Sequence, residues 1–464
     1  MSQLCAQAES MTSSSLAKTN PARVVHQWEA VCLIVGLVIG AGIFKTPSLV
    51  AQFTQDPGWL ITAWVVGAVV SFTGALCYAE LSSAYPHIGG EYHFLTLAYG
   101  RRLSFLYAWT KATVINPGSI ALLAFVFSDA ISRLLPLGLR SEGMGALVVV
   151  LVLTASNLLG LRVATGIQKP LVLVILVGLL IISIAGFASN GHLASISTEA
   201  FQSSPRPASL GTALVFVLLT FGGWNEAATI SSEVRGGPRA VTNVLVLSLV
   251  LITAIYLVFN LSLLSALGIS GLAQSSAAAV DVLGQTLGRW AELAVILLIG
   301  AAALTSINAT MVMGARANHA LGQGWQALGF LGGWQRVRST PTRSFLVQSL
   351  FSSALIAIAA VQPDGFTAIV EYTAPLFWAF LTLIALSLII LRRRSGAPSV
   401  NTFQTPLFPL CPLLFAVACV YLAFSSFQHA AANEPAFLSL FVLLSGVVAL
   451  VGLCLRQRKL HLLS

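Results

Sequence analysis

The stretch Val35-Gly36-Leu37-Val38-Ile39-Gly40-Ala41-Gly42-Ile43-Phe44 lies within the first long apolar segment of the chain. Two of its glycines, Gly40 and Gly42, fall close to the middle of a membrane-spanning segment. Glycine lowers helix stability and tolerates backbone angles that other residues avoid. The stretch therefore predicts a break in the first spanning helix.

A second stretch of this kind begins about 180 residues later. Thr220-Phe221-Gly222-Gly223-Trp224-Asn225-Glu226 places a glycine pair, an amide and a carboxylate at a similar depth. A break in lipid strands backbone donors and acceptors, so it persists only where it lines a cavity. For either motif alone, close helix–helix packing is the alternative. Because the two motifs open successive blocks of five spans, they favour an inverted-repeat transporter with its ligand at the repeat interface.

The composition of the whole chain is that of a membrane protein. Of its 464 residues, 57% are hydrophobic and 8% are charged, whereas soluble proteins carry about 25% charged residues. A bilayer-spanning helix needs roughly twenty apolar residues, and the ten-residue alternation of a membrane β-barrel is missing. The predicted fold class is therefore an all-α polytopic membrane protein. Its twelve expected spans lie near residues 28–53, 58–84, 103–131, 143–162, 168–188, 209–232, 240–266, 290–320, 343–361, 365–391, 406–427 and 435–455.

The basic residues predict the orientation of these spans. If the N-terminus is cytoplasmic, eighteen of the 24 Lys and Arg residues fall in inner segments, which is a strong positive-inside bias. The net charge of +9 thus reflects the orientation of the spans in the membrane. No basic domain for nucleic-acid binding is present. The remaining basic residues are Arg133, Arg140, Arg206 and Arg289 in outer segments and Lys45 and Lys111 within spans.

Backbone chemistry at the two breaks predicts the ligand. The outer half of the first span would begin with free N–H groups from about Ala41 to Phe44, where the helix dipole favours a carboxylate. Carbonyls near Val38 and Ile39, and near Thr220 and Phe221, would suit an ammonium group. A zwitterion with both charges, such as an α-amino acid, fits this arrangement. The candidate substrate-binding residues are Ile39, Gly40, Ala41, Gly42, Ile43, Thr220, Phe221, Gly222, Gly223, Asn225 and Glu226.

Charged residues inside spans are costly and are functional candidates by default. Glu226 is expected to pair with a substrate ammonium, hold a basic side chain or carry a coupled proton; stabilising the N-terminus of the inner half-helix is the alternative. Lys111 is expected to pair with Glu226 or Glu80, or to extend toward the inner face. Glu226 and Lys111 are therefore the coupling candidates. Lys45 is expected in an outer vestibule.

Other charged and polar residues have simpler expected roles. Glu80 and Glu233 lie near cytoplasmic span ends, where they are expected to pair with Arg101, Arg102 or Arg235. The polar or aromatic side chains that could shape the pocket are Trp224, Asn116 and Ser306.

No pattern in the sequence indicates an enzyme, a cofactor or a metal site. The six cysteines are scattered without metal-ligand spacing, and motifs such as H-E-x-x-H are missing. A channel, the other non-enzymatic class, usually shows a filter ring or repeats around a continuous pore. Saturable transport with counterflow would separate a carrier from a channel.

Several motifs together resemble one family of permeases. Gly40 through Phe44 is similar to its G-[SA]-G-I-F motif, and Glu80 through Tyr92 to its E-L-x-x-x-Y-P-x-x-G-G-E-Y stretch. Further matches lie at Asn157 through Gln168, at Phe221 through Glu226 and at Gly314-Ala315-Arg316. The chain thus resembles the amino acid–polyamine–organocation superfamily, most closely its bacterial L-type amino acid transporter-like branch.

This resemblance implies a leucine-transporter-type fold, with 5+5 inverted repeats, helices 1 and 6 broken and two extra helices. It also implies alternating access, sodium-independent transport by exchange or proton coupling, and no catalysis. Two positions depart from the family: Ile175 stands where many L-type relatives carry a lysine, and Leu219 where they carry an aromatic gate. A polyamine or other organic amine is the alternative substrate.

The expected organisation follows from these motifs. Residues 1–24 form a cytoplasmic disordered tail, residues 25–391 the transporter core with repeats at about 25–190 and 205–391, and residues 392–464 helices 11 and 12 with a short cytoplasmic C-terminus. The expected location is the bacterial cytoplasmic membrane, with both termini inside. Expected partners are an amino acid substrate and the lipid bilayer. Animal relatives use a heavy chain, but nothing in this sequence indicates a partner subunit.

Overall fold

The computed structural model describes residues 26–87, 89–134, 141–159, 168–189, 191–226, 234–335, 340–395, 402–432 and 441–453. Within these ranges the chain is predominantly helical, and Gln335 and Thr340 form an isolated β-bridge. The all-α class is confirmed. The predicted tail at 1–24, Glu233, and residues 160–167 of the fourth-to-fifth-span motif lie outside the described residues.

Nine helices in the described ranges are long and apolar enough to cross a membrane. They are α4 (Pro57–Ala84), the continuous run of α6 (Arg101–Thr110), η1 (Lys111–Ile115) and α7 (Asn116–Leu134), then α8 (Ser141–Leu159), α10 (Gln168–Ala188), α14 (Gly237–Gln274), α16 (Arg289–Gly324), α17 (Thr342–Ala359), α18 (Gly365–Ser395) and α19 (Leu410–Ala432). The bent pair α2 (Gln27–Val38) and α3 (Gly42–Thr54) is apolar enough to cross as a tenth span if its two helices form one broken segment. The helix α12 (Pro207–Thr220) and the helix at Phe441–Leu453 are apolar but shorter. The count of twelve spans therefore stays a prediction.

Shorter helices connect the spans. They are α5 (Gly90–Tyr99), α11 (Leu193–Glu199), α15 (Ala278–Leu287) and the single turns η2 (Trp224–Glu226) and η3 (Gln326–Leu328). The seventh predicted span, 240–266, is longer in the structure because α14 continues past a kink at Gly268. There the backbone has φ 67°, a left-handed conformation that glycine adopts without steric cost.

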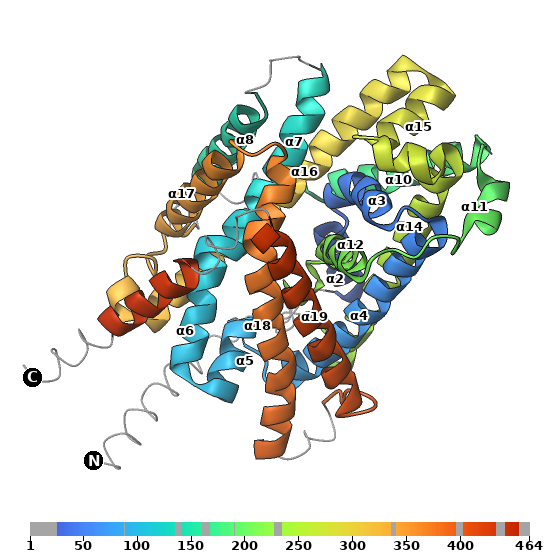
Figure 1. Ribbon diagram of the computed structural model, residues 1–464. Helices are drawn as coiled ribbons and strands as arrows, with labels where there is room; N and C mark the ends of the chain where they lie inside the picture. Colours follow the sequence, from blue (N-terminus) through green and yellow to red (C-terminus); the bar gives the residue numbers. More distant parts are fainter. Residues whose placement is uncertain are drawn as a thin grey trace, which may run out of the picture.

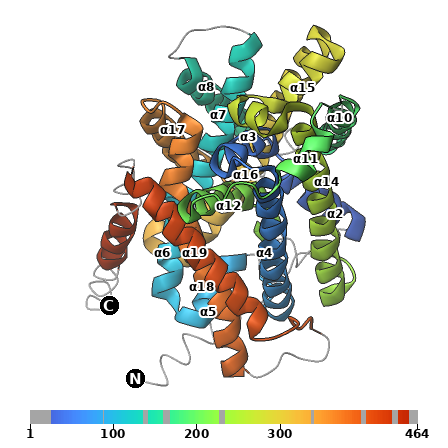
Figure 2. The ribbon, with the colours of Figure 1, turned by 45° about the vertical axis from the view of Figure 1, so that its right-hand side comes forward.

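The two interrupted segments lie side by side in the middle of the molecule. Helices α3 and α12 are adjacent in Figures 1 and 2, and they are in contact. Around them the most extensive packing joins α18 with α19, α16 with α7 and α14 with α4. Residues far apart in sequence thus enclose the two breaks predicted from glycine pairs.

One carboxylate organises the connection from α3 to α4. Asp56 caps α4 by accepting hydrogen bonds from the backbone N–H groups of Gly58 (2.8 Å) and Trp59 (3.1 Å). It also accepts from the N–H groups of Phe201 (3.0 Å) and Ser203 (3.1 Å), 145 and 147 residues away. Burial raises the pKa of Asp56, but these backbone donors together outweigh burial and hold the pKa below its usual value.

The end of α4 toward the predicted cytoplasmic side is tied to the end of α18. Glu80 accepts hydrogen bonds from Arg392 Nε (2.6 Å) and Nη2 (3.0 Å), and from the backbone N–H of Thr405 (2.6 Å). The expected pairing of Glu80 with Arg101, Arg102 or Arg235 was wrong, because the last turn of α18 brings a different arginine to this carboxylate. Arg101 instead donates to the Gly324 carbonyl, and Arg235 lies 3.0 Å from the His26 ring.

Candidate functional site

The first break separates α2, which ends at Val38, from α3, which begins at Gly42. The two helices meet at 49°. The N–H groups of Gly42 and Ile43 belong to the first turn of α3 and so have no acceptor within that helix. The Phe44 N–H, which was expected to be free, donates to the Ala41 carbonyl at 3.2 Å. The run of N–H groups without a helical acceptor at the start of α3 is thus shorter than the sequence suggested.

The sixth-span break begins where α12 ends at Thr220. The Gly222 N–H donates to the Leu219 carbonyl (3.0 Å), and the Gly223 N–H donates to Asn225 Oδ1 (3.2 Å). Gly223 has φ 114°, and a Cβ there would lie 3.3 Å from the Leu37 carbonyl oxygen. Only glycine fits this conformation beside the first break.

Tyr256 on α14 connects the two breaks. Its hydroxyl lies 3.0 Å from the Val38 carbonyl oxygen and 3.0 Å from the Thr220 carbonyl oxygen, and its single hydrogen is shared between these two acceptors. Val38 also accepts from the Gly40 N–H at 2.8 Å. Both acceptor positions of the Val38 carbonyl are therefore occupied, which argues against the predicted role of Val38 as an ammonium ligand.

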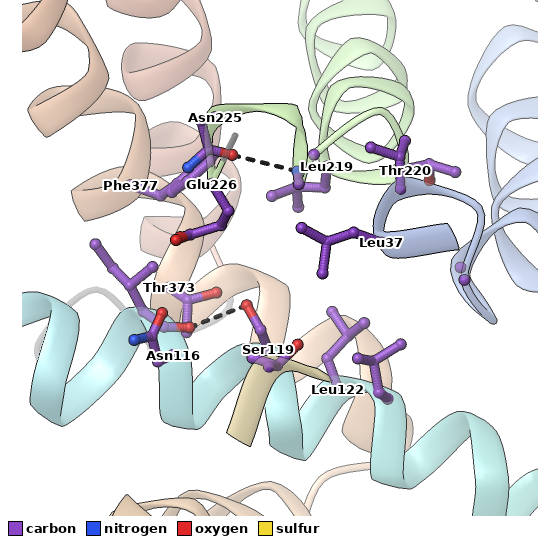
Figure 3. A pocket seen from close by; sticks show the side chains of 18 of the residues that line it. Leu37, Asn116, Ser119, Leu122, Leu219, Thr220, Asn225, Glu226, Thr373 and Phe377 are labelled. Carbon is purple, nitrogen blue, oxygen red and sulfur yellow. Dashed lines mark hydrogen bonds between the residues drawn. The ribbon is translucent and has the colours of Figure 1, made fainter. Parts of the chain in front are cut away.

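The two breaks border one cavity of about 200 Å³. Figure 3 shows Asn225 and Glu226 of the sixth-span break facing Asn116 and Ser119 of α7 across this space, with Thr373 of α18 beside them. Among the predicted residues, those that line the cavity are Gly40, Gly42, Thr220, Gly222, Gly223, Asn225, Glu226 and Lys111.

Four predicted residues lie behind the cavity rather than in its lining. The side chains of Ile39, Ala41, Ile43 and Phe221 are buried in the surrounding core. The Phe221 ring packs against Trp64 and Tyr256. These four residues can contribute to the site only through their backbone, as the argument from helix breaks requires.

Lys111 bridges two carboxylates at the edge of the cavity. Its Nζ lies 2.7 Å from Glu91 Oε2 and 2.8 Å from Glu226 Oε1. The expected partner Glu226 is thus present, whereas Glu80 is not in contact and Glu91 takes its place. All three side chains line the same cavity.

A local change of helix type accompanies this lysine. Residues Lys111–Ile115 form a π-helical turn between α6 and α7. Such turns widen a helix locally and occur frequently at functional sites. The third span is therefore continuous but locally widened at Lys111, which the sequence analysis did not predict.

Glu91 is the main site residue that sequence reasoning missed. Its carboxylate accepts hydrogen bonds from the Tyr78 hydroxyl (2.7 Å), the Tyr107 hydroxyl and Asn225 Nδ2 (3.0 Å), besides Lys111. The signal that could have found it is its place near the end of the Glu80-to-Tyr92 motif. Its four partners come from three separate segments, namely α4, the Arg101–Leu134 helix and η2, and that arrangement is not visible in the linear sequence.

Other predicted residues lie as follows. Ser306 lines the cavity, and its hydroxyl is buried with no hydrogen-bond partner in the described structure. Ile175 is 1% exposed within the core. Asn116 and Leu219 line the cavity, whereas Trp224 packs on Tyr78 and Phe415.

The remaining charged candidate, Lys45, lies apart from the main cavity. Lys45 pairs with Asp129 at 3.7 Å beside a second, small cavity. Among the described residues, no group of three His, Cys, Asp or Glu side chains could hold a metal ion.

Comparison with known proteins gives the family. Residues 25–450 match the family described as amino acid permease. The chain belongs to that family. This permease is 27% identical to the b(0,+)-type amino acid transporter 1 of Rattus norvegicus over 449 residues, which cover 95% of the chain and 90% of the relative.

Two further relatives have related names. The permease is 24% identical to the serine/threonine exchanger SteT of Bacillus subtilis, over 83% of the chain and 86% of the relative. It is 29% identical to the Asc-type amino acid transporter 1 of Mus musculus, over 56% of the chain and 51% of the relative. The resemblance inferred from motifs is confirmed, and a family of transporters supports a non-enzymatic role.

Proposed function

We propose that this permease is a secondary transporter that moves α-amino acids across the bacterial cytoplasmic membrane by alternating access, with both termini inside. The observation that carries the proposal is the meeting of two interrupted spans at one cavity of about 200 Å³. Its relatives are named as amino acid transporters or exchangers. Inverted repeats at about residues 25–190 and 205–391 would move against each other around this site.

The proposed ligand contacts follow from the chemistry of the breaks. The substrate carboxylate binds the N–H groups of Gly42 and Ile43 at the N-terminus of α3, where the helix dipole stabilises an anion. The ammonium group binds the backbone carbonyls of Ile39 and Phe221. Ser306 supplies a hydroxyl beside Gly40. A polyamine has no carboxylate for α3, and this speaks against the alternative substrate class.

Exchange is the proposed mode of coupling, and sodium is not required. The name of the bacterial relative, a serine/threonine exchanger, supports exchange. Proton coupling is the second mode, with Glu226 and Lys111 as the residues that would carry it, because they are the charged pair at the sixth-span break. A single chain is expected to suffice, without a partner subunit.

Reconstitution of the purified chain into proteoliposomes tests the proposal. Uptake of each of the twenty amino acids is measured with and without internal substrate, with and without a pH gradient, and with choline in place of sodium. We expect saturable uptake that internal substrate accelerates and that choline leaves unchanged. Uptake that collapses in choline would refute sodium independence. A flux that neither saturates nor shows counterflow would indicate a channel.

A further inference from the structure

The cavity already contains a cation of its own, the Lys111 ammonium, which lies between the carboxylates of Glu91 and Glu226. The side chain of Lys111 is 12% exposed, that of Glu91 6% and that of Glu226 19%. The cation and both anions are thus largely removed from solvent. In such surroundings a charge interacts strongly with its neighbours.

The two carboxylates are held in different ways. Glu91 also accepts hydrogen bonds from Tyr78, Tyr107 and Asn225, so its position is fixed by three neutral donors as well as by Lys111. Glu226 belongs to η2, directly after the sixth-span break, and faces the cavity in Figure 3. A ligand bound at the breaks would therefore have Glu226 and the Lys111 ammonium near its side chain.

We propose that the Lys111 ammonium occupies the position that the side-chain cation of a basic amino acid would take, and that it thereby restricts transport to amino acids with uncharged side chains. This inference rests on the proposed amino acid transport. A second cation would have to share Glu226 with the Lys111 ammonium, which already lies 2.8 Å from its Oε1, and the contact between the two cations discriminates between ligands without any contact to the preferred one. Removal of the lysine takes the same ammonium away from both carboxylates, a costly change that a cationic ligand would offset.

The wild-type protein in proteoliposomes gives the first test. Uptake is compared within two pairs of ligands in which a terminal methyl is replaced by an ammonium: L-norvaline with L-2,4-diaminobutyrate, and L-norleucine with L-ornithine. We expect the neutral member of a transported pair to be taken up at least tenfold faster. Equal uptake of both members overturns the proposal, even though it leaves amino acid transport itself intact. Failure to transport any amino acid would instead refute the proposed function.

The variant Lys111→Ala gives the second test. We expect the ratio of cationic to neutral uptake to rise at least tenfold, and the double variant Lys111→Ala/Glu226→Gln to lose most of that rise. Lys45→Ala is the matched control, because it removes another lysine within a predicted span, one that pairs with Asp129 beside a different cavity, and it should leave the ratio unchanged. A Lys111→Ala protein that transports neutral amino acids with an unaltered ratio overturns the proposal.

Chemical rescue covers the case in which Lys111→Ala is folded but inactive. n-Propylammonium supplies the atoms that the substitution removes, so adding it should restore neutral amino acid uptake, whereas propanol should not. A folded variant that shows neither cationic uptake nor rescue contradicts the proposal. If the variant does not fold, the wild-type comparison of paired ligands decides alone.

Discussion

The glycines of the first break differ in what surrounds them. A Cβ at Gly42 would lie 3.8 Å from Thr220 Oγ1, an ordinary contact, whereas a Cβ at Gly40 would lie 2.4 Å from Ser306 Oγ. Gly42 also borders the cavity. A methyl group is therefore tolerated at Gly42, but a longer side chain there projects into the proposed carboxylate site.

We predict graded effects at these two positions. Gly42→Leu should abolish binding while the protein remains inserted, because it removes contacts to a charged group worth about 1.5–3 kcal/mol each. Gly42→Ala should keep affinity within about fivefold, or about 1 kcal/mol. Gly40→Ala should be more harmful than Gly42→Ala, because Ser306 must move. Substrate-induced thermal stabilisation measures binding, and size-exclusion profiles in detergent control for folding. Normal transport by the Gly42→Leu variant would show that Gly42 is not part of the substrate-binding site.

Residues with a local signal were the ones that the sequence identified. Gly40, Gly42 and the Gly222–Gly223 pair stand out because glycine destabilises a helix and the two motifs recur in matching places, a coincidence that close helix packing alone does not explain. Glu91 was missed since its role depends on Asn225, 134 residues away, and on the Tyr78 hydroxyl. Glu80 was given the wrong partner because several arginines lie at inner span ends, and only the packing of α18 selects among them.

Single side chains join separate helices of the fold, and Tyr256 is one such side chain. Its hydroxyl is a buried donor shared by carbonyls from α2 and α12. Loss of one partner from a buried hydrogen bond costs about 1–3 kcal/mol. The distance between the two breaks therefore depends on α14, which contributes no other residue to the proposed ligand contacts.

We expect Tyr256→Phe to lower both thermal stability and substrate affinity, the latter about tenfold, which corresponds to about 1.4 kcal/mol. The control is Tyr99→Phe, which removes a similar hydrogen bond from a tyrosine hydroxyl to the Leu383 carbonyl (2.8 Å) away from the breaks. That control should lose stability without losing affinity. Unchanged affinity in Tyr256→Phe would show that the breaks keep their spacing without the hydroxyl.

Asp56 joins α4 to the segment that precedes α12, and its pKa predicts a pH effect on stability. Because the folded protein holds this pKa below its usual value, the ionised carboxylate stabilises the fold above the unfolded pKa of about 3.9, and that contribution is lost as the pH falls through the folded pKa. Asp56→Asn should therefore lower the melting temperature at pH 7, and the gap to wild type should narrow toward pH 3.

A second aspartate provides the control for this prediction. Asp364 caps α18 by accepting from the N–H groups of Phe366 and Thr367, and in the described structure its side-chain hydrogen bonds stay within the first turn of this helix. Asp364→Asn should lose less stability than Asp56→Asn at pH 7. A melting-temperature gap for Asp56→Asn that is constant from pH 7 to pH 3 would contradict the electrostatic explanation.

At the scale of the whole molecule, the Glu80–Arg392 pair joins the proposed first repeat to the proposed second. The side chain of Glu80 is 1% exposed and that of Arg392 14%, so removal of the arginine leaves a buried carboxylate without its cation. Such a loss costs about 3–5 kcal/mol. The same contact holds α4 and α18 together at the predicted inner end, where an inward-opening movement would have to separate them.

Arg392→Ala should therefore strongly lower the melting temperature, and Arg392→Lys should fall between it and wild type because lysine cannot form the two parallel hydrogen bonds. Arg393, the exposed neighbour on α18, is the matched control, and Arg393→Ala should change stability by less than about 0.5 kcal/mol. Equal melting temperatures for the Arg392 and Arg393 variants would show that the ion pair adds nothing to stability.

The Tyr256 hydroxyl between the two breaks has a consequence for substrate selectivity. Tyr256 holds the ends of α2 and α12 together, beside the carbonyl groups proposed for the ammonium. The N–H groups proposed for the carboxylate begin at Gly42, four residues after the end of α2, so the two sets of contacts would keep a constant separation. A site with a constant separation between these contacts selects ligands by the same charge-to-charge distance on either side of the membrane. β-Amino acids, whose charged groups are one carbon further apart, would then be excluded equally from the outside and from the inside. The selectivity of the site would be the same in the outward-open and inward-open states.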